Sequence, residues 1–390
     1  MKKYLIIFVF CLLSAGCSNY DELNNLSIVT GVSLDKKDDI YEVSYLIANS
    51  PKGQTSSKEG EAKTTVYSGK GKTIPDAAME IEQKSPKKIY LGHINVVVIS
   101  EEISKEGFFK TAGWLIRNSE TRKKFYLLQA KDEEAKNILK IVSPLESFPS
   151  QSIATLLESN HDSKSASTAI TYSTFIGHVL EKGYDPILPS ISIVGDSKKG
   201  SNEENIKTTT PTAYNILGPL AIFRSDKLVG YATIEESQFI NLLQNQTDQI
   251  KYTLKINNNK ISIDSYNISS NTKLKNKNTI DINVKASGTI QNISGNINIK
   301  DYNEIKNIEN HWNENLKKDL YKIIDRMKNE YECDVFGFGN KIYLKYPRYF
   351  EKIEKDWNDK YFKNVKVNIK TNLKIISTGS LQETLKEAKK

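Results

Sequence analysis

The side chains most often used for catalysis and metal binding are few in this chain, and they are scattered. Its 390 residues include three cysteines, Cys11, Cys17 and Cys333, and they form no CxxC pair. The four histidines, at positions 93, 161, 178 and 311, lack the short spacing that places two of them on one face of a helix or strand. Zinc sites usually draw on closely spaced ligands. The sequence therefore predicts no metal site and no cofactor.

Motifs for nucleotide binding and hydrolysis are also missing. Gly195 and Gly200 have the spacing of a phosphate-binding loop, but Ser201 follows where that motif needs lysine. Residues 337–342 begin as GxG and lack the third glycine of a dinucleotide motif, and no GxSxG nucleophile elbow occurs. A Ser-His-Asp triad has no fixed spacing, so the sequence leaves that possibility open. We predict that the chain is not an enzyme.

Cys17 stands apart from the other two cysteines because it ends a segment with the three parts of a secretory signal. Two lysines precede an apolar run from Tyr4 to Leu13, and small residues then lead directly to the cysteine. Such an ending is typical of a bacterial lipobox, in which the cysteine receives a diacylglyceryl group and becomes the mature N-terminus. Ser14 stands where that motif usually has leucine. An ordinary signal peptide with an incidental cysteine is the alternative.

Composition excludes several classes of protein. Hydrophobic residues make up 38% of the chain, enough for a sizeable core, so wholesale disorder is excluded. The mean hydropathy of −0.48 excludes a polytopic membrane protein. The net charge of +8 is mild for this length, whereas nucleic-acid binders concentrate positive charge in one domain. We therefore expect no nucleic-acid partner.

The pattern of apolar residues divides the chain into successive regions. Val96 to Ile99 is a continuous β-branched run, which predicts a strand covered on both faces, and residues 103–116 have a helical pattern. The expected regions are a signal peptide at 1–16, a lipidated tether at 17–27, an N-terminal α+β region at 28–196 that could divide again near 131, a linker at 197–211, a C-terminal α+β domain at 212–380 and a polar tail at 381–390.

The C-terminal domain has the clearest periodic patterns. Residues 280–290 alternate strictly between apolar and polar side chains, which predicts an antiparallel strand with one wet face. Apolar residues between Ile305 and Tyr331 recur every three or four positions, which predicts one long amphipathic helix. Packing against the sheet is favoured over a membrane-surface position because the polar side of the helix mixes acidic and basic residues. The expected fold class is α+β and multi-domain, with mainly antiparallel sheets and packed helices.

Several segments, taken in order, resemble a known family. They are Glu22–Leu26 with Ile28–Val32, His93–Glu102 with Gly107, Arg117–Asn118 with Arg122, Leu217–Gly230, Asp334–Gly339 with Trp357, and Val365–Ile376. Together, behind a lipobox, they resemble the Ger(x)C family, the lipoprotein component of spore nutrient-germinant receptors. Within the C-terminal signature, Gly337 and Gly339 alternate with two phenylalanines. This spacing predicts positive φ or close backbone approach at the glycines and buried phenyl rings.

The resemblance implies a function without enzymatic activity. Such proteins are anchored at the outer face of the spore inner membrane, and they act with two integral-membrane subunits to trigger germination in response to nutrients. Glu101, Glu102 and Arg348, in or beside the matching segments, are our candidate exposed contacts for those partners. The alternatives are a lipid-anchored solute-binding protein of an importer, which would favour a parallel sheet, and a surface hydrolase, which would need a catalytic motif.

Overall fold

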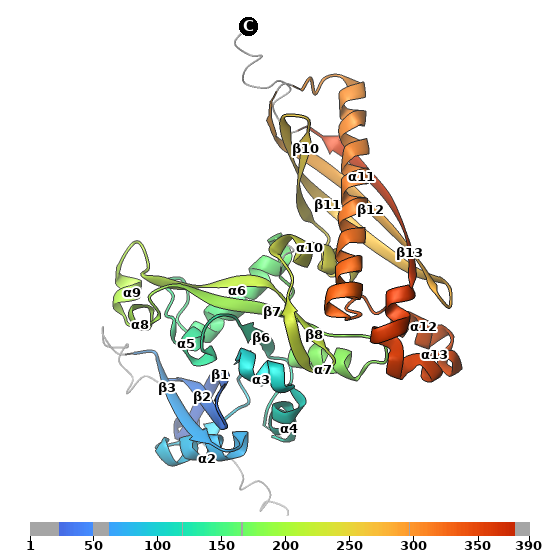
Figure 1. The fold of residues 1–390 in the computed structure, drawn as a ribbon. Coiled ribbons are helices and arrows are strands. Elements are labelled where there is room, and N and C mark those ends of the chain that lie inside the picture. The colour runs from blue at the N-terminus through green and yellow to red at the C-terminus, as the bar shows by residue number, and fades with distance from the viewer. Residues whose placement is uncertain (1–22, 50–61, 119, 165–166, 296, 379–390) are drawn as a thin grey trace, which may run out of the picture.

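The computed structural model describes residues 23–49, 62–118, 120–164, 167–295 and 297–378, and these fold around two β-sheets with packed helices (Figure 1). The α+β class predicted from the sequence is confirmed. Cys17, the signal peptide and the residues of the polar tail lie outside the described residues. The described chain opens with a short 3₁₀ turn, η1 (Leu23–Asn25), that leads directly into the first strand.

The first sheet is large and mixed. Within the described residues it has nine strands in the order β3-β2-β1-β5-β6-β7-β8-β9, with β4 also paired to β1. The strands are β1 (Leu26–Lys37), β2 (Ile40–Ala48), β3 (Thr64–Gly71), β4 (Lys88–Tyr90), β5 (Val96–Ile99), β6 (Tyr126–Ala130), β7 (Ile187–Gly195), β8 (Ala213–Arg224) and β9 (Lys227–Tyr231). The flanking pairs are antiparallel, but β1, β5, β6 and β7 run parallel in the middle. The sequence did not predict this parallel centre.

Helices cover both faces of the parallel centre. One face carries α2 (Ile74–Lys84), α3 (Glu101–Glu106), α4 (Phe109–Arg117) and α7 (Tyr172–Leu180), and the other carries α5 (Ala135–Lys140) and α6 (Pro149–Lys164). Strand β5 contributes Val97 and Ile99 to one core and Val96 and Val98 to the other, which confirms the prediction of a strand covered on both sides.

The helix predicted over residues 103–116 is interrupted. Gly107 has φ of +116°, in a region that only glycine adopts readily, and it separates α3 from α4. The carbonyl of Asp226 accepts a hydrogen bond from the Phe108 amide at 2.9 Å, so the break lets the chain bond to the β8–β9 turn. Helical periodicity alone gave no sign of this break.

Residues 197–211, predicted to be a linker, contain two short helices, α8 (Ser197–Gly200) and α9 (Glu204–Lys207). Asn205 is fully buried there and donates to the carbonyls of Val142 and Ala213, both at 2.9 Å. After this segment, β8 and β9 return to the first sheet, although the sequence pattern assigns them to the C-terminal domain. The division of the chain into separate folding units stays a prediction.

The second sheet lies under one long helix, as Figure 1 shows. After α10 (Ile234–Leu243) come β10 (Ile250–Ile256), β11 (Asn259–Asn276) and β12 (Thr279–Ser294), joined antiparallel, and then α11 (Tyr302–Arg326). The last strand, β13 (Lys366–Ser377), pairs parallel with β12. Trp312, Leu316 and Leu320 on α11 are fully buried, so the prediction that this helix packs across the sheet is confirmed.

Short helical segments connect α11 to β13. They are η2 (Met327–Tyr331), α12 (Phe338–Lys345), α13 (Pro347–Ile353), η3 (Glu354–Asp356), η4 (Trp357–Tyr361) and η5 (Phe362–Asn364). Of these, η2 and η4 are π-helical turns, a form that often marks functional or structurally demanding positions. The C-terminal signature, Asp334–Gly339, follows η2 and ends in the first turn of α12.

Candidate functional site

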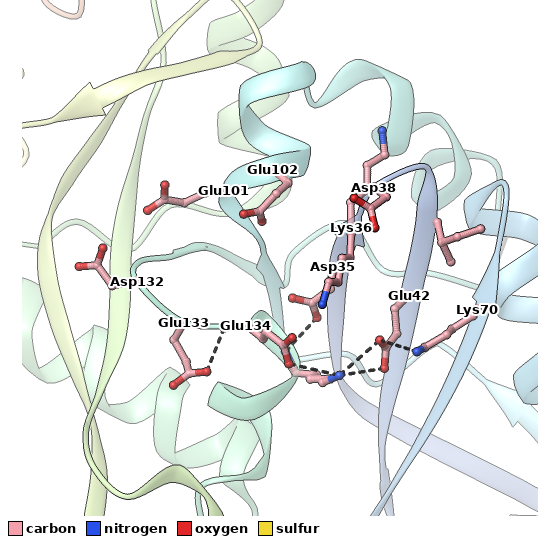
Figure 2. Close-up of a pocket in the computed structure, with 13 residues that line it drawn as sticks. Asp35, Lys36, Asp38, Glu42, Lys70, Glu101, Glu102, Asp132, Glu133 and Glu134 are labelled. Atoms are coloured by element: carbon pink, nitrogen blue, oxygen red, sulfur yellow. Dashed lines mark hydrogen bonds and ion pairs between the residues drawn. The ribbon is translucent and has the colours of Figure 1, made fainter.

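The parallel strands bring three acidic loops to one edge of the first sheet. Strands β1, β5 and β6 run in the same direction, so the residues that end or follow them, Asp35–Asp38, Glu101–Glu102 and Asp132–Glu134, meet at the carboxyl ends of the strands. They line a cavity of about 850 Å³ (Figure 2). Crevices at this edge are where α/β sheets commonly bind ligands. We call this cavity the acidic groove.

Charge is the main property of the acidic groove. Eight of its thirteen lining residues are aspartate or glutamate and four are lysine. Lys136 pairs with Glu42 and with Glu134, both at 3.2 Å, and Lys70 reaches Glu42 at 3.8 Å. In Figure 2 the ion pairs of Glu42 lie toward the lower right, Glu102 lies above them, and Asp132 lies at the left. The arrangement suits a basic segment of a partner.

Asp35 holds the floor of the groove together. Its carboxylate oxygens accept hydrogen bonds from the backbone amides of Ala135 and Lys136, at 2.7 and 3.0 Å, and so tie the start of α5 to the end of β1. Burial raises the pKa of Asp35 to about 6, although the two amides act in the opposite direction. The role of Asp35 is therefore structural support of the groove.

The structure places Glu101 and Glu102 in this groove but corrects the expectation that both are exposed. The Glu101 side chain is only 21% exposed, and its carboxylate accepts from the Tyr231 hydroxyl at 2.9 Å and from Lys105 at 2.7 Å. The first turn of α3 lies against β9, which covers Glu101 and leaves Glu102 exposed. Arg348 is exposed on α13, and it does not line the acidic groove.

Within 23–49, 62–118, 120–164, 167–295 and 297–378, no three acidic, histidine or cysteine side chains converge in a way that could hold a metal ion. In those same ranges no helix has both the length and the apolar character needed to cross a bilayer.

The C-terminal signature forms a second, buried site. The carboxylate of Asp334 accepts three hydrogen bonds, from the amides of Phe338 and Gly339 at 3.1 and 2.7 Å and from the Trp357 indole at 3.1 Å. Burial raises the pKa of Asp334 to about 7. One buried side chain thus joins the end of η2, the start of α12 and the start of η4.

Asp185 extends this site into the first sheet, and sequence reasoning missed it. Its carboxylate accepts from the amides of Ser225 and Asp334, both at 2.8 Å, and from the Asn358 side chain at 2.7 Å. Asp185 lies just before β7, so it links the C-terminal signature to the β8–β9 turn. We call the pair Asp185 and Asp334 the carboxylate junction. Its only sequence signal was the Asp-Pro step that precedes a strand.

The two signature glycines behave as the sequence predicts. Gly337 has φ of +66°, and a β-carbon at Gly339 would lie 2.7 Å from the Trp357 ring and 2.8 Å from the Gly183 backbone. Phe336 and Phe338 are buried and their rings stack 5.3 Å apart. Positive φ at one glycine, close approach at the other and buried phenyl groups are all confirmed.

Comparison with known proteins identifies the family. Residues 19–193 match the family model described as the spore germination protein N-terminal domain, and residues 219–379 match the model described as spore germination B3/GerAC like, C-terminal. The chain belongs to this spore germination family. The resemblance seen in the sequence is therefore confirmed.

Full-length relatives agree with this assignment. Spore germination protein KC of Bacillus subtilis is 26% identical over 99% of this chain and 98% of its own length, and spore germination protein B3 of the same organism is 23% identical over 97% and 98%. The crystal structure of the GerBC protein has the same fold, with a TM-score of 0.53 and 17% identity over 92% of this chain and 100% of that one.

Proposed function

We propose that this spore germination family member is the lipid-anchored, non-catalytic subunit of a nutrient germinant receptor. The observation that supports this most directly is the match of both family models, in order, together with relatives covered from end to end. In this proposal the subunit acts with two integral-membrane subunits at the outer face of the spore inner membrane. It binds those partners through its folded surface and carries out no chemical step.

Deleting the gene tests this proposal. Spores without the protein should fail to respond to the receptor's nutrient, yet they should germinate normally with triggers that bypass receptors. Restoring the gene should restore the nutrient response. If the deletion also abolished the response to receptor-independent triggers, the protein would act downstream and the receptor assignment would be wrong.

The membrane anchor is a separate part of the proposal. Acylation of Cys17 would hold the body at the membrane, and two or more acyl chains are needed for stable attachment. Cys17→Ala removes the proposed acylation site, so the variant should move from the detergent phase to the aqueous phase in phase partitioning. Equal partitioning of wild type and variant would refute the anchor.

We propose Glu102 in the acidic groove and Arg348 on α13 as partner contacts, because both are exposed in or beside segments with family resemblance. Charge reversal by Glu102→Lys or Arg348→Glu should weaken co-purification with the membrane subunits and leave folding intact. Glu204→Lys, an equal charge change at an exposed residue of α9 outside the groove, is the matched control. Glu101 is a poor probe because its bond to Tyr231 supports the fold.

One observation favours the alternative of a solute-binding protein. The acidic groove lies at the carboxyl ends of parallel strands, where many α/β proteins hold small ligands. The end-to-end relatives named as spore germination proteins support the receptor instead. The two proposals differ in phenotype, since loss of an importer component should impair uptake in growing cells and leave nutrient-triggered germination unchanged.

A further inference from the structure

The edge of the first sheet opposite the acidic groove is basic. Strands β1, β4 and β6 belong to the parallel set, so they begin at the same edge. Lys87 and Lys88 lie at the start of β4, and Arg122, Lys123 and Lys124 lie just before β6; all five are exposed. The residues that begin β4 and precede β6 are therefore basic, whereas the residues that follow β5 and β6 are acidic.

A groove with an aromatic floor lies beside these charges. A cavity of about 660 Å³ between α2, α4 and β4 is lined by Tyr45, Trp114 and apolar residues of β4 and α2, with Lys87, Lys88 and Arg117 among its polar residues. The rings of Tyr45 and Trp114 stack 6.4 Å apart, and Met79 at the groove is 54% exposed. Glu82 and Glu120 also line the cavity and offset part of the basic charge.

This basic edge is also where the chain enters the folded body. Leu26, the first residue of β1, pairs with Lys88, and Ser27 pairs with Ile89. Cys17 precedes Leu26 by nine residues. Nine residues span at most about 32 Å when fully extended. A membrane anchor at Cys17 would therefore keep the basic edge within about 32 Å of the lipid surface, so that this edge can reach the headgroups.

We infer that this edge binds anionic phospholipid headgroups and so fixes the orientation of the anchored body. We call it the amino-end face: Lys87, Lys88, Arg117, Arg122, Lys123 and Lys124, with Met79 and Trp114. Basic side chains gain attraction near an anionic bilayer, and tryptophan favours the headgroup region. The inference adds an orientation to the proposed function, and it rests on that proposal for the anchor at Cys17. It can be tested without the acyl chains.

The test uses the full mature chain with Cys17→Ser, so that no acyl group contributes to binding. We expect it to sediment with vesicles of equal parts phosphatidylglycerol and phosphatidylcholine, but not with phosphatidylcholine alone, and to be released by high salt. Each basic residue near such a surface changes affinity about fivefold, so Lys87→Gln with Lys88→Gln should weaken binding about 25-fold. Lys370→Gln with Lys374→Gln, both exposed on β13, is the matched control and should bind like the parent.

Two results would overturn the inference. The first is failure of the Cys17→Ser chain to bind the phosphatidylglycerol vesicles. The second is equal weakening of binding in both double variants, because binding would then follow net charge and not this face. Circular dichroism of each variant separates loss of binding from loss of folding. The outcome is independent of the anchor, because detergent partitioning of Cys17→Ala reports acylation without the vesicle assay.

Discussion

Substitution of Gly339 by alanine probes the packing of the C-terminal signature with a single methyl group. The added carbon would lie 2.7 Å from the Trp357 ring and 2.8 Å from the Cα of Gly183, both well inside van der Waals contact. Trp357 is 4% exposed and its indole donates to Asp334, so the ring cannot move without loss of that bond. The carbonyl of Gly183 accepts from the Asn340 amide at 3.0 Å, which holds the other side of the contact.

These contacts give the expected size of the effect. Overpacking of a buried site costs about 1–3 kcal/mol, and loss of a hydrogen bond to a carboxylate costs about 1.5–3 kcal/mol. Within α12, alanine favours the helix over glycine by about 1 kcal/mol, which offsets part of this destabilisation. The net destabilisation should therefore be about 1.5–5 kcal/mol. At about 2–4 °C per kcal/mol, the midpoint of thermal unfolding should fall by about 3–20 °C.

The same substitution at Gly177 is the matched control. Gly177 is exposed on α7, and a β-carbon there would meet no atom within 4 Å. Gly177→Ala should therefore stabilise the protein by about 1 kcal/mol through helix propensity. Urea unfolding of both variants, followed by tryptophan fluorescence, measures the two effects. If Gly339→Ala were as stable as Gly177→Ala, Trp357 would not pack closely against Gly339.

Two further predictions concern buried titratable groups. Burial raises the pKa of Asp334 from 3.8 to about 7, so the native state loses stability as pH rises from 3.8 to about 7. Asp334→Asn cannot titrate, so the stability of this variant relative to wild type should rise over the same pH range. Urea unfolding of both proteins at the two limits of the range measures this difference. Cys333 is fully buried with its pKa raised by burial, so its thiol should react with a disulfide reagent only after unfolding; rapid reaction of the native Cys17→Ser chain would contradict this.

Local signals in the sequence predicted many elements correctly. The run Val96–Ile99 forms a buried strand, and residues 280–290 lie in β12, where burial alternates along the strand. Gly337 has positive φ and Gly339 is closely packed, as the alternation with phenylalanine predicts. These features depend on residues within a few positions of one another. Their physical causes, namely burial and backbone conformation, are therefore visible in a short stretch of sequence.

The features that the sequence could not predict depend on contacts between distant segments. The parallel pairing of β5 with β1 joins residues more than sixty positions apart, and it decides which loops share an edge. The carboxylate junction joins Asp185 to Asp334, which lie 149 positions apart in the sequence. Glu101 looked exposed because nothing near it in sequence shows that Tyr231 covers it. Periodicity reports how a segment is buried but not which segment buries it.

The parallel strands also set the distance between the two charged edges of the first sheet. Asp35, on the floor of the acidic groove, follows Leu26 by nine residues along β1. At about 3.3 Å per residue, these lie about 30 Å apart. Electrostatic screening acts over about 8 Å at physiological ionic strength. With the amino-end face on the bilayer, anionic headgroups would neither attract nor repel a segment at the acidic groove. A receptor subunit that contacts Glu102 must then project about 30 Å beyond the lipid surface, which favours an extracytoplasmic domain over a short loop between spanning helices.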